Sequence, residues 1–121
     1  MPTEFSIHVA IAQFLRSALD HDAAVWAHYP AGEIRDKRTA SKLKVMGTVA
    51  GWPDLMLLRN GQMYFLEIKN EKGRLSATQK AMAERLTQQG GFFQVARSVE
   101  DVEAILIAWG FPLRGRLVRA A

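Results

Sequence analysis

Residues 53–69, PDLMLLRNGQMYFLEIK, contain the two strands from which the rest of the fold can be predicted. Two runs rich in Leu and Met flank Asn60-Gly61, the dipeptide that most strongly favours a two-residue hairpin turn. Both runs are apolar through most of their length, so we expect an antiparallel pair of strands at the centre of a sheet. Three charged residues interrupt this apolar pattern near one end of the hairpin: Asp54, Glu67 and Lys69.

Strand geometry predicts where these charges lie. With Asn60-Gly61 as the turn, regular pairing places Asp54 opposite Glu67. Because side chains alternate along a strand, Glu67 and Lys69 share one face. Two opposed carboxylates repel, and burying them unpaired costs on the order of several kcal/mol. A divalent cation between them would remove both penalties, and Lys69 would add a positive charge beside it.

A solvated ion-pair cluster at the strand ends is the simpler interpretation for any one of these residues. The convergence of all three on one face, behind Pro53 and a tight turn, instead favours a metal site.

The segments around the hairpin alternate between helical and extended patterns. A helix is expected after Thr3, with an apolar stripe at Ile7, Ile11, Phe14, Leu15 and Ala18. A strand is expected within residues 23–30, a basic helix ending at Gly47, a helix over 76–89, a strand over 92–97, and a final helix opened by Ser98 and ended by Gly110. The resulting order, α-β-α-β-β-α-β-α, predicts an α/β fold with a central mixed sheet flanked by helices on both sides.

Composition limits the class of protein. The chain has 121 residues, of which 49% are hydrophobic and 23% charged, so we expect one soluble domain over residues 1–121. It has no apolar run of roughly 18 residues and no signal-peptide pattern at its start, which predicts a cytoplasmic protein without a membrane span. It also has no Cys, so a metal would be held by oxygen or imidazole, which favours Mg²⁺, Mn²⁺ or Ca²⁺.

Basic residues are unevenly distributed. Lys and Arg number 16 against 12 for Asp and Glu, a net charge of +4. Residues 35–44, RDKRTASKLK, carry five bases and one acid, and a second basic group closes the chain at Arg114, Arg116 and Arg119. Such a cluster is typical of a phosphate-backbone binder, although a solubilising surface explains the charge equally well. The Lys, Ala and Leu pattern of this segment does not indicate base readout.

The charged residues of the hairpin also carry a resemblance to a known family. Pro53-Asp54, a hairpin and Glu67-Ile68-Lys69 match the PD-(D/E)XK nuclease pattern. The longer string, from Gly51 through Gly73-Arg74-Leu75-Ser76 to Gln79, resembles the VRR-NUC (virus-type replication-repair nuclease) family and extends over most of residues 4–97. His8 departs from the Gln of many relatives, and no role is assigned to it.

The resemblance implies a restriction-endonuclease-like core and a role for each matching residue. Asp54 and Glu67 would bind Mg²⁺ or Mn²⁺ with the Ile68 carbonyl, and Glu4 would complete the acidic cluster directly or through water. Lys69 would orient or deprotonate the attacking water, with Gln79 helping to position the water or the phosphate. Backbone contacts to DNA are expected from Arg35, Lys37, Arg38, Lys42, Lys44 and Arg74.

The implied activity is metal-dependent DNA endonuclease chemistry. We expect it to be structure-selective, acting on branched DNA such as four-way junctions, rather than sequence-specific. Small stand-alone relatives are phage or prophage-like, and the resemblance implies a homodimer that needs no small-molecule cofactor. Two alternatives stay open: a catalytically weak or inactive DNA-binding module of the same fold, and a partner-binding protein whose acids form a surface charge cluster.

Overall fold

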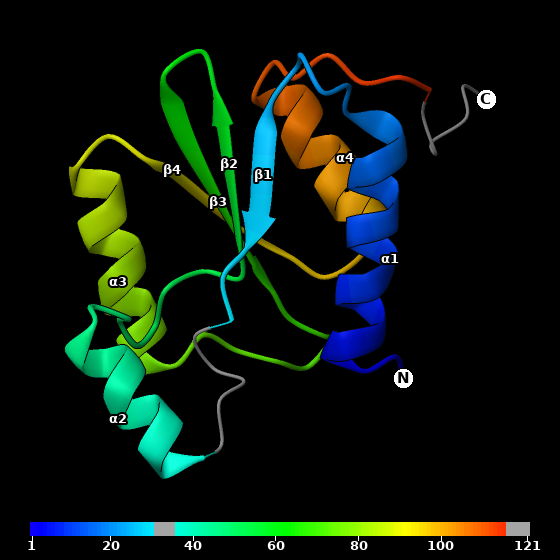
Figure 1. Ribbon diagram of the computed structural model, residues 1–121. Coiled ribbons are helices and arrows are strands. Elements are labelled where there is room, and N and C mark those ends of the chain that lie inside the picture. Colours follow the sequence, from blue (N-terminus) through cyan, green and yellow to red (C-terminus); the bar gives the residue numbers. More distant parts are fainter. Residues whose placement is uncertain (31–35, 116–121) are drawn as a thin grey trace.

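The computed structural model describes residues 1–30 and 36–115, so Arg35, Arg116 and Arg119 lie outside the described residues. The order of helices and strands predicted from the sequence is confirmed (Figure 1). The elements are α1 (Glu4–Ala18), β1 (Val25–His28), α2 (Lys37–Val45), β2 (Leu55–Arg59), β3 (Gln62–Ile68), α3 (Ala77–Gln88), β4 (Phe92–Ala96) and α4 (Val99–Ala108).

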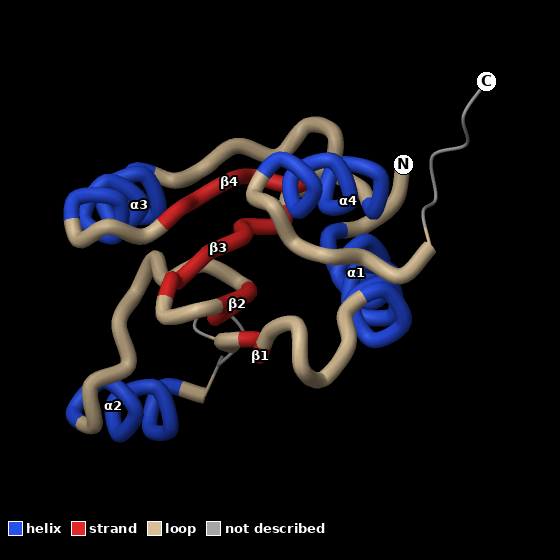
Figure 2. Tube along the Cα trace, turned by 90° about the horizontal axis from the view of Figure 1, so that it is seen from above, coloured by secondary structure: helices blue, strands red, loops and turns tan. Residues whose placement is uncertain are grey.

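The sheet is mixed, with strand order β1-β2-β3-β4. β2 pairs antiparallel with both β1 and β3, whereas β3 and β4 are parallel because α3 connects them as a crossover. The hairpin strands β2 and β3 are therefore central, as predicted. Figure 2 shows α1 and α4 on one face of the sheet and α2 and α3 on the other, so the α/β fold with helices on both faces is confirmed.

The predicted hairpin register is also confirmed. Asn60 and Gly61 both have positive φ, 50° and 77°, as a type I′ turn requires. The ladder pairs Arg59 with Gln62 at the turn and Leu55 with Leu66 at the other end. The next position beyond that end brings Asp54 to the level of Glu67.

The hydrophobic core lies between the sheet and the α1–α4 face. The apolar stripe predicted for α1 is buried at all five of its positions, Ile7, Ile11, Phe14, Leu15 and Ala18. Leu66 and Ile68 project from β3 into this core. Glu67 and Lys69 follow the opposite alternation and line a cavity outside that core. The core thus fixes the face on which the charged residues are presented.

Helix N-termini are capped as the sequence predicts. Thr3 and Ser76 each accept a hydrogen bond from a backbone N–H of the following turn. Ser98 does the same for α4, but the Asp101 carboxylate accepts from the N–H of Arg97 rather than completing a capping box with Ser98. No helix in the described part of the chain is long and apolar enough to cross a membrane.

Helix α2 differs from the other helices because none of its residues is buried. Val45 and the adjoining Met46 are 89% and 80% exposed. An isolated helix of this length is marginal in water, since tertiary packing normally stabilises short helices. Helix α2 therefore offers a basic and partly apolar surface that the rest of the described chain does not cover.

Gly51, two residues before Pro53, has φ +82°, and a Cβ there would lie 2.8 Å from the backbone oxygen of Thr78. We expect Gly51→Ala to destabilise the protein by about 1–3 kcal/mol or more, because backbone strain adds to a clash with α3. Gly47→Ala is the matched control, since Gly47 also has positive φ (+105°) but nothing lies within 4 Å of its added Cβ. Urea unfolding of both variants checks this, and an equal loss in the two would contradict the proposed close approach.

Candidate active site

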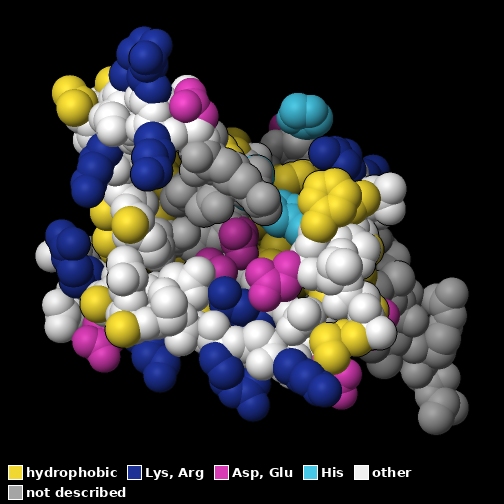
Figure 3. Space-filling model, turned by 90° about the horizontal axis from the view of Figure 1, so that it is seen from below, with side chains coloured by type: hydrophobic (Ala, Val, Ile, Leu, Met, Phe, Trp, Pro, Cys, Tyr) yellow, Lys and Arg dark blue, Asp and Glu magenta, His cyan; other side chains and the backbone are white. Residues whose placement is uncertain are grey.

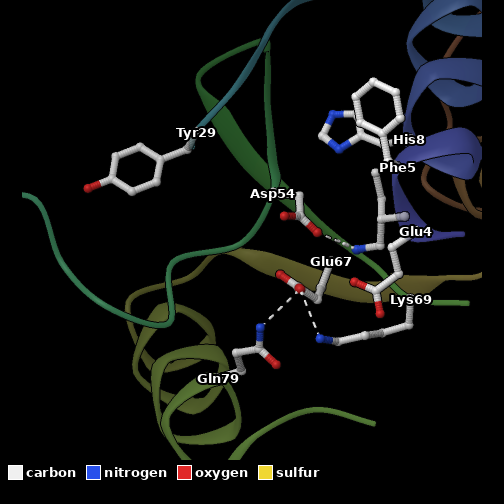
Figure 4. Close-up of a pocket in the computed structure, with 9 residues that line it drawn as sticks. Glu4, Phe5, His8, Tyr29, Asp54, Glu67, Lys69 and Gln79 are labelled. Atoms are coloured by element: carbon white, nitrogen blue, oxygen red, sulfur yellow. Dashed lines mark hydrogen bonds and ion pairs between the residues drawn. The ribbon is translucent and has the colours of Figure 1, made fainter. Parts of the chain in front are cut away.

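A cavity of about 500 Å³ opens where β2 begins and β3 ends. Figure 3 shows acidic side chains on the floor of this hollow, with Lys and Arg side chains along part of its rim. In Figure 4 the acids come from the strands and from the first turn of α1, while α3 supplies Gln79. The lining residues are Glu4, Phe5, His8, Tyr29, Asp54, Glu67, Ile68, Lys69 and Gln79.

Asp54 is held by hydrogen bonds to both its side chain and its backbone. Its Oδ2 accepts from the Ile68 N–H at 2.7 Å. Its carbonyl oxygen accepts from the Tyr29 N–H at 2.8 Å and lies 2.8 Å from His28 Nδ1. Because a carbonyl only accepts, this contact requires the proton of His28 to be on Nδ1. Two neighbouring strands thus fix the direction of the Asp54 carboxylate.

Glu67 is an acid in a buried position, only 4% exposed. Burial, then the neighbouring Asp54 carboxylate, raises the pKa of Glu67 to about 8, although Lys69 opposes this shift. Gln79 Nε2 donates to Glu67 Oε2 at 3.1 Å, and Lys69 Nζ lies 3.5 Å from the same oxygen. Burial and the Asp54 carboxylate therefore disfavour the charged form of Glu67, and a bound cation would favour that form.

Lys69 is also buried, at 9% exposure, with its ammonium group directed at Glu67 (Figure 4). The turn that follows lies against it, since a Cβ on Gly73 would be 3.0 Å from Glu4 Oε2 and 3.2 Å from Lys69 Cδ. Arg97 Nη1 donates to the carbonyl oxygens of Asn70 and Gly73 at 2.6 and 2.8 Å and so holds this turn. Glu67 and Lys69 are therefore buried rather than solvated at the protein surface, whereas Asp54 is partly exposed.

The donor set fits a hard divalent cation. Within residues 1–30 and 36–115, no group of three His, Asp or Glu side chains is placed to hold a metal by itself. Two carboxylates, a strand-end carbonyl and water are the oxygen donors that Mg²⁺ and Mn²⁺ use, because Mg²⁺ usually keeps several waters. Glu4 lines the same cavity, and its contact with the ion, directly or through water, stays a prediction.

The comparisons with known proteins agree with this geometry. A family model described as VRR-NUC domain matches residues 13–100. The chain belongs to the VRR-NUC family. A solved structure titled "VRR_NUC domain protein" is similar to it, with a TM-score of 0.71 and 23% identity, covering 90% of this chain and 88% of the other. Another, titled "VRR_NUC domain", has a TM-score of 0.58 and 17% identity over 88% of this chain and 97% of the other. No curated protein matches the chain.

The VRR-NUC match establishes a nuclease-type fold. The two solved structures share 23% and 17% identity with this chain, so they support its fold and nothing further. The matched region includes the candidate site residues Asp54, Glu67, Ile68, Lys69 and Gln79. Glu4 precedes it, so its place in the acidic cluster rests on the cavity that it lines.

The residues predicted to contact DNA lie on two separate segments of this VRR-NUC domain. Lys37, Arg38, Lys42 and Lys44 are exposed on α2. Arg74 is exposed on the turn after β3, where its guanidinium donates to the Gly73 carbonyl oxygen at 3.2 Å. Arg35 is outside the described residues.

The sequence did not indicate that β1 and the residue after it hold Asp54 in place. Tyr29 fixes the Asp54 backbone, and its hydroxyl oxygen accepts from the Val49 N–H at 3.0 Å, which ties the loop after α2 to the site. Trp52 packs between Tyr29 and Phe65, and its buried indole Nε1 has no hydrogen-bond partner among the described residues. In the sequence, Tyr29-Pro30 indicates only where a strand ends. It does not indicate that Tyr29 contacts Asp54.

Proposed function

We propose that this VRR-NUC domain is a metal-dependent DNA endonuclease that hydrolyses phosphodiester bonds and prefers branched DNA, such as flaps or four-way junctions. One observation carries the proposal: Asp54, directly before β2, and Glu67 of β3 line the same cavity, and Glu67 is buried beside the buried Lys69. A structural role alone does not explain this arrangement, because two neighbouring carboxylates at a buried position repel each other and destabilise a fold.

The acids would hold Mg²⁺ or Mn²⁺. Asp54 and Glu67 would bind the ion with the Ile68 carbonyl, and Glu4 would contribute directly or through water. When bound, the ion would lower the pKa of a water and stabilise negative charge on phosphate oxygens. Asp54 is already oriented for this by the Ile68 N–H, and Glu67 by Gln79.

Lys69 would act on the nucleophile. Its Nζ lies 3.5 Å from Glu67 Oε2, at the wall of the cavity that would admit a phosphate. There it can orient the attacking water, accept its proton when neutral, or offset charge on the phosphate. Gln79 keeps Glu67 in place and, through the Ser76 N–H, links the site to the first turn of α3.

DNA would be gripped through its backbone by α2 and Arg74. We expect Lys42→Gln/Lys44→Gln to weaken DNA binding at all sequences and to reduce the slope of log K against log salt by about 0.9 per lost phosphate contact. The double variant Lys80→Gln/Arg85→Gln is the control with the same charge change, because both bases are exposed on α3 and neither lines the cavity. Fluorescence anisotropy across a salt series measures both slopes, and equal slopes would contradict the role of α2.

A homodimer would supply two active sites for the paired cuts that a symmetric junction requires. Support comes from α2, whose exposed Val45 and Met46 offer apolar surface without a partner in the described chain. Sizing in solution tests this: a monomer at working concentrations would rule out the paired-cut model without affecting the hydrolytic site.

The proposal is tested by cleavage of labelled linear, flapped and four-way-junction DNA with Mg²⁺, Mn²⁺ or EDTA. We expect metal-dependent products, with branched substrates cut faster than linear duplex. Asp54→Ala, Glu67→Ala and Lys69→Ala should lose the activity. If every substrate survives with metal, the catalytically inactive DNA-binding module becomes the better interpretation. Equal rates of cleavage of linear and branched DNA would reject the proposed preference for branched DNA and retain the proposed nuclease activity.

A further inference from the structure

A second groove lies next to the candidate active site, between α1 and β1. It has a volume of about 350 Å³, and Phe5 and His8 line both it and the catalytic cavity. Trp26 and His28 line it from β1, and Arg16 from the last turn of α1. The groove is therefore a continuation of the catalytic cavity along α1.

Phe5 forms the boundary between the two hollows. It is 78% exposed although the neighbouring Ile7 is buried in the core. In Figure 4 its ring stands beside His8 above the acidic cluster. Single exposed apolar residues are common on proteins, so exposure alone carries no argument. Its position between an aromatic groove and the candidate active site distinguishes Phe5 from the other exposed apolar residues.

The remaining walls suit a planar, partly polar ligand. The His8 and His28 rings meet edge-to-face at 4.4 Å and lie on the side of the groove nearest the catalytic cavity. At the other end, the Arg16 guanidinium lies 5.8 Å from the centre of the Trp26 ring. From Phe5 to Arg16 the helix extends about 16 Å. At a spacing of about 3.4 Å per stacked nucleotide, this length accommodates more than one nucleotide.

We propose that this groove binds an unpaired nucleobase next to the scissile phosphate, with Phe5 stacking on the base and Arg16 meeting the following phosphate or base edge. Aromatic side chains bind single-stranded DNA in this sequence-tolerant way, because every base presents a π face. A fully paired duplex keeps its bases stacked inside and cannot fill the groove. Phe5 is then a specificity-determining residue that favours branched over linear DNA, a role that rests on the proposed nuclease function.

The test uses flapped DNA with 2-aminopurine at the unpaired nucleotide beside the branch, in EDTA, so that binding is read without cleavage. The parent protein should quench the 2-aminopurine on binding. Phe5→Leu should lose the quenching and bind the flap roughly tenfold to hundredfold more weakly, while binding paired duplex as before. Phe5→Trp should restore the quenching. Phe92→Leu is the control, because Phe92 is also an exposed aromatic but packs on Tyr64 away from the cavity.

Three outcomes would overturn the inference: no quenching by the parent, an equal loss of flap and duplex binding in Phe5→Leu, or a change of its oligomeric state, which would make the groove an interface between copies. Quenching that depends on Phe5 in a protein that cuts no DNA would instead retain the base site and reject the nuclease. Metal-dependent cleavage by a protein whose flap binding is unaffected by Phe5→Leu would retain the nuclease and reject the base site.

Discussion

Lys69→Met is expected to reduce the single-turnover rate of DNA cleavage by about 10²–10⁴-fold at saturating Mn²⁺, the usual effect of removing a group that moves a proton in the transition state. Met keeps the length of the side chain that packs against Gly73 but lacks the ammonium group 3.5 Å from Glu67. Binding of Mn²⁺, measured by calorimetry, should be retained because both acids remain.

Lys72→Met is the matched control, since Lys72 is exposed on the adjoining turn. This variant should cleave DNA at the parent rate. If Lys69→Met cleaves as fast as Lys72→Met, Lys69 serves only to balance the charge of Glu67. If it loses Mn²⁺ binding instead of rate, its role is to hold the acids in place.

Glu67→Gln is expected to abolish cleavage and yet stabilise the metal-free protein at pH 8–9. The pKa of Glu67 is raised from 4.5 to about 8 in the folded state, so between these values the folded state keeps a proton that the unfolded state has lost. The free energy of unfolding therefore falls as pH rises through this window, by about 1.4 kcal/mol per pH unit. Gln carries no such charge and removes a penalty on the order of a few kcal/mol, which should raise Tm by roughly 10 °C.

Thermal unfolding in EDTA at pH 4 and pH 9 measures this effect. The two proteins should differ little at pH 4, where Glu67 is protonated in both states. Glu71→Gln makes the same change at an exposed position and should show no pH-dependent gain. A Glu67→Gln protein that is no more stable than the parent at pH 9 would show that the folded state tolerates the charge without a metal.

Much of the fold followed from local pattern. Asn60-Gly61 has one low-energy hairpin geometry, and this geometry set the register that brings Asp54 to Glu67. Strand alternation then separated Glu67 and Lys69 from the core-facing Leu66 and Ile68. These predictions succeeded because each depends on residues close together in the chain.

Features that depend on distant segments were not predicted. The support of Asp54 by Tyr29 and His28 arises from pairing of β1 with β2 across 26 residues of sequence. The exposure of Phe5 depends on which part of the α1 surface the sheet leaves uncovered. The burial of Glu67 and Lys69 required the turn held by Arg97, and periodicity carries no information on such tertiary contacts.

The most direct test of the Asp54–Glu67–Lys69 site is the single-turnover cleavage of one end-labelled branched DNA by the parent, Asp54→Asn and Asp22→Asn proteins, each with Mn²⁺ and with EDTA. Asn keeps an acceptor for the Ile68 N–H, whereas Asp22 is exposed outside the cavity and controls for the same substitution. We predict cleavage by the parent and Asp22→Asn only with Mn²⁺, and none by Asp54→Asn. Cleavage by Asp54→Asn at the parent rate, or cleavage that persists in EDTA, would contradict a metal-dependent site at these carboxylates.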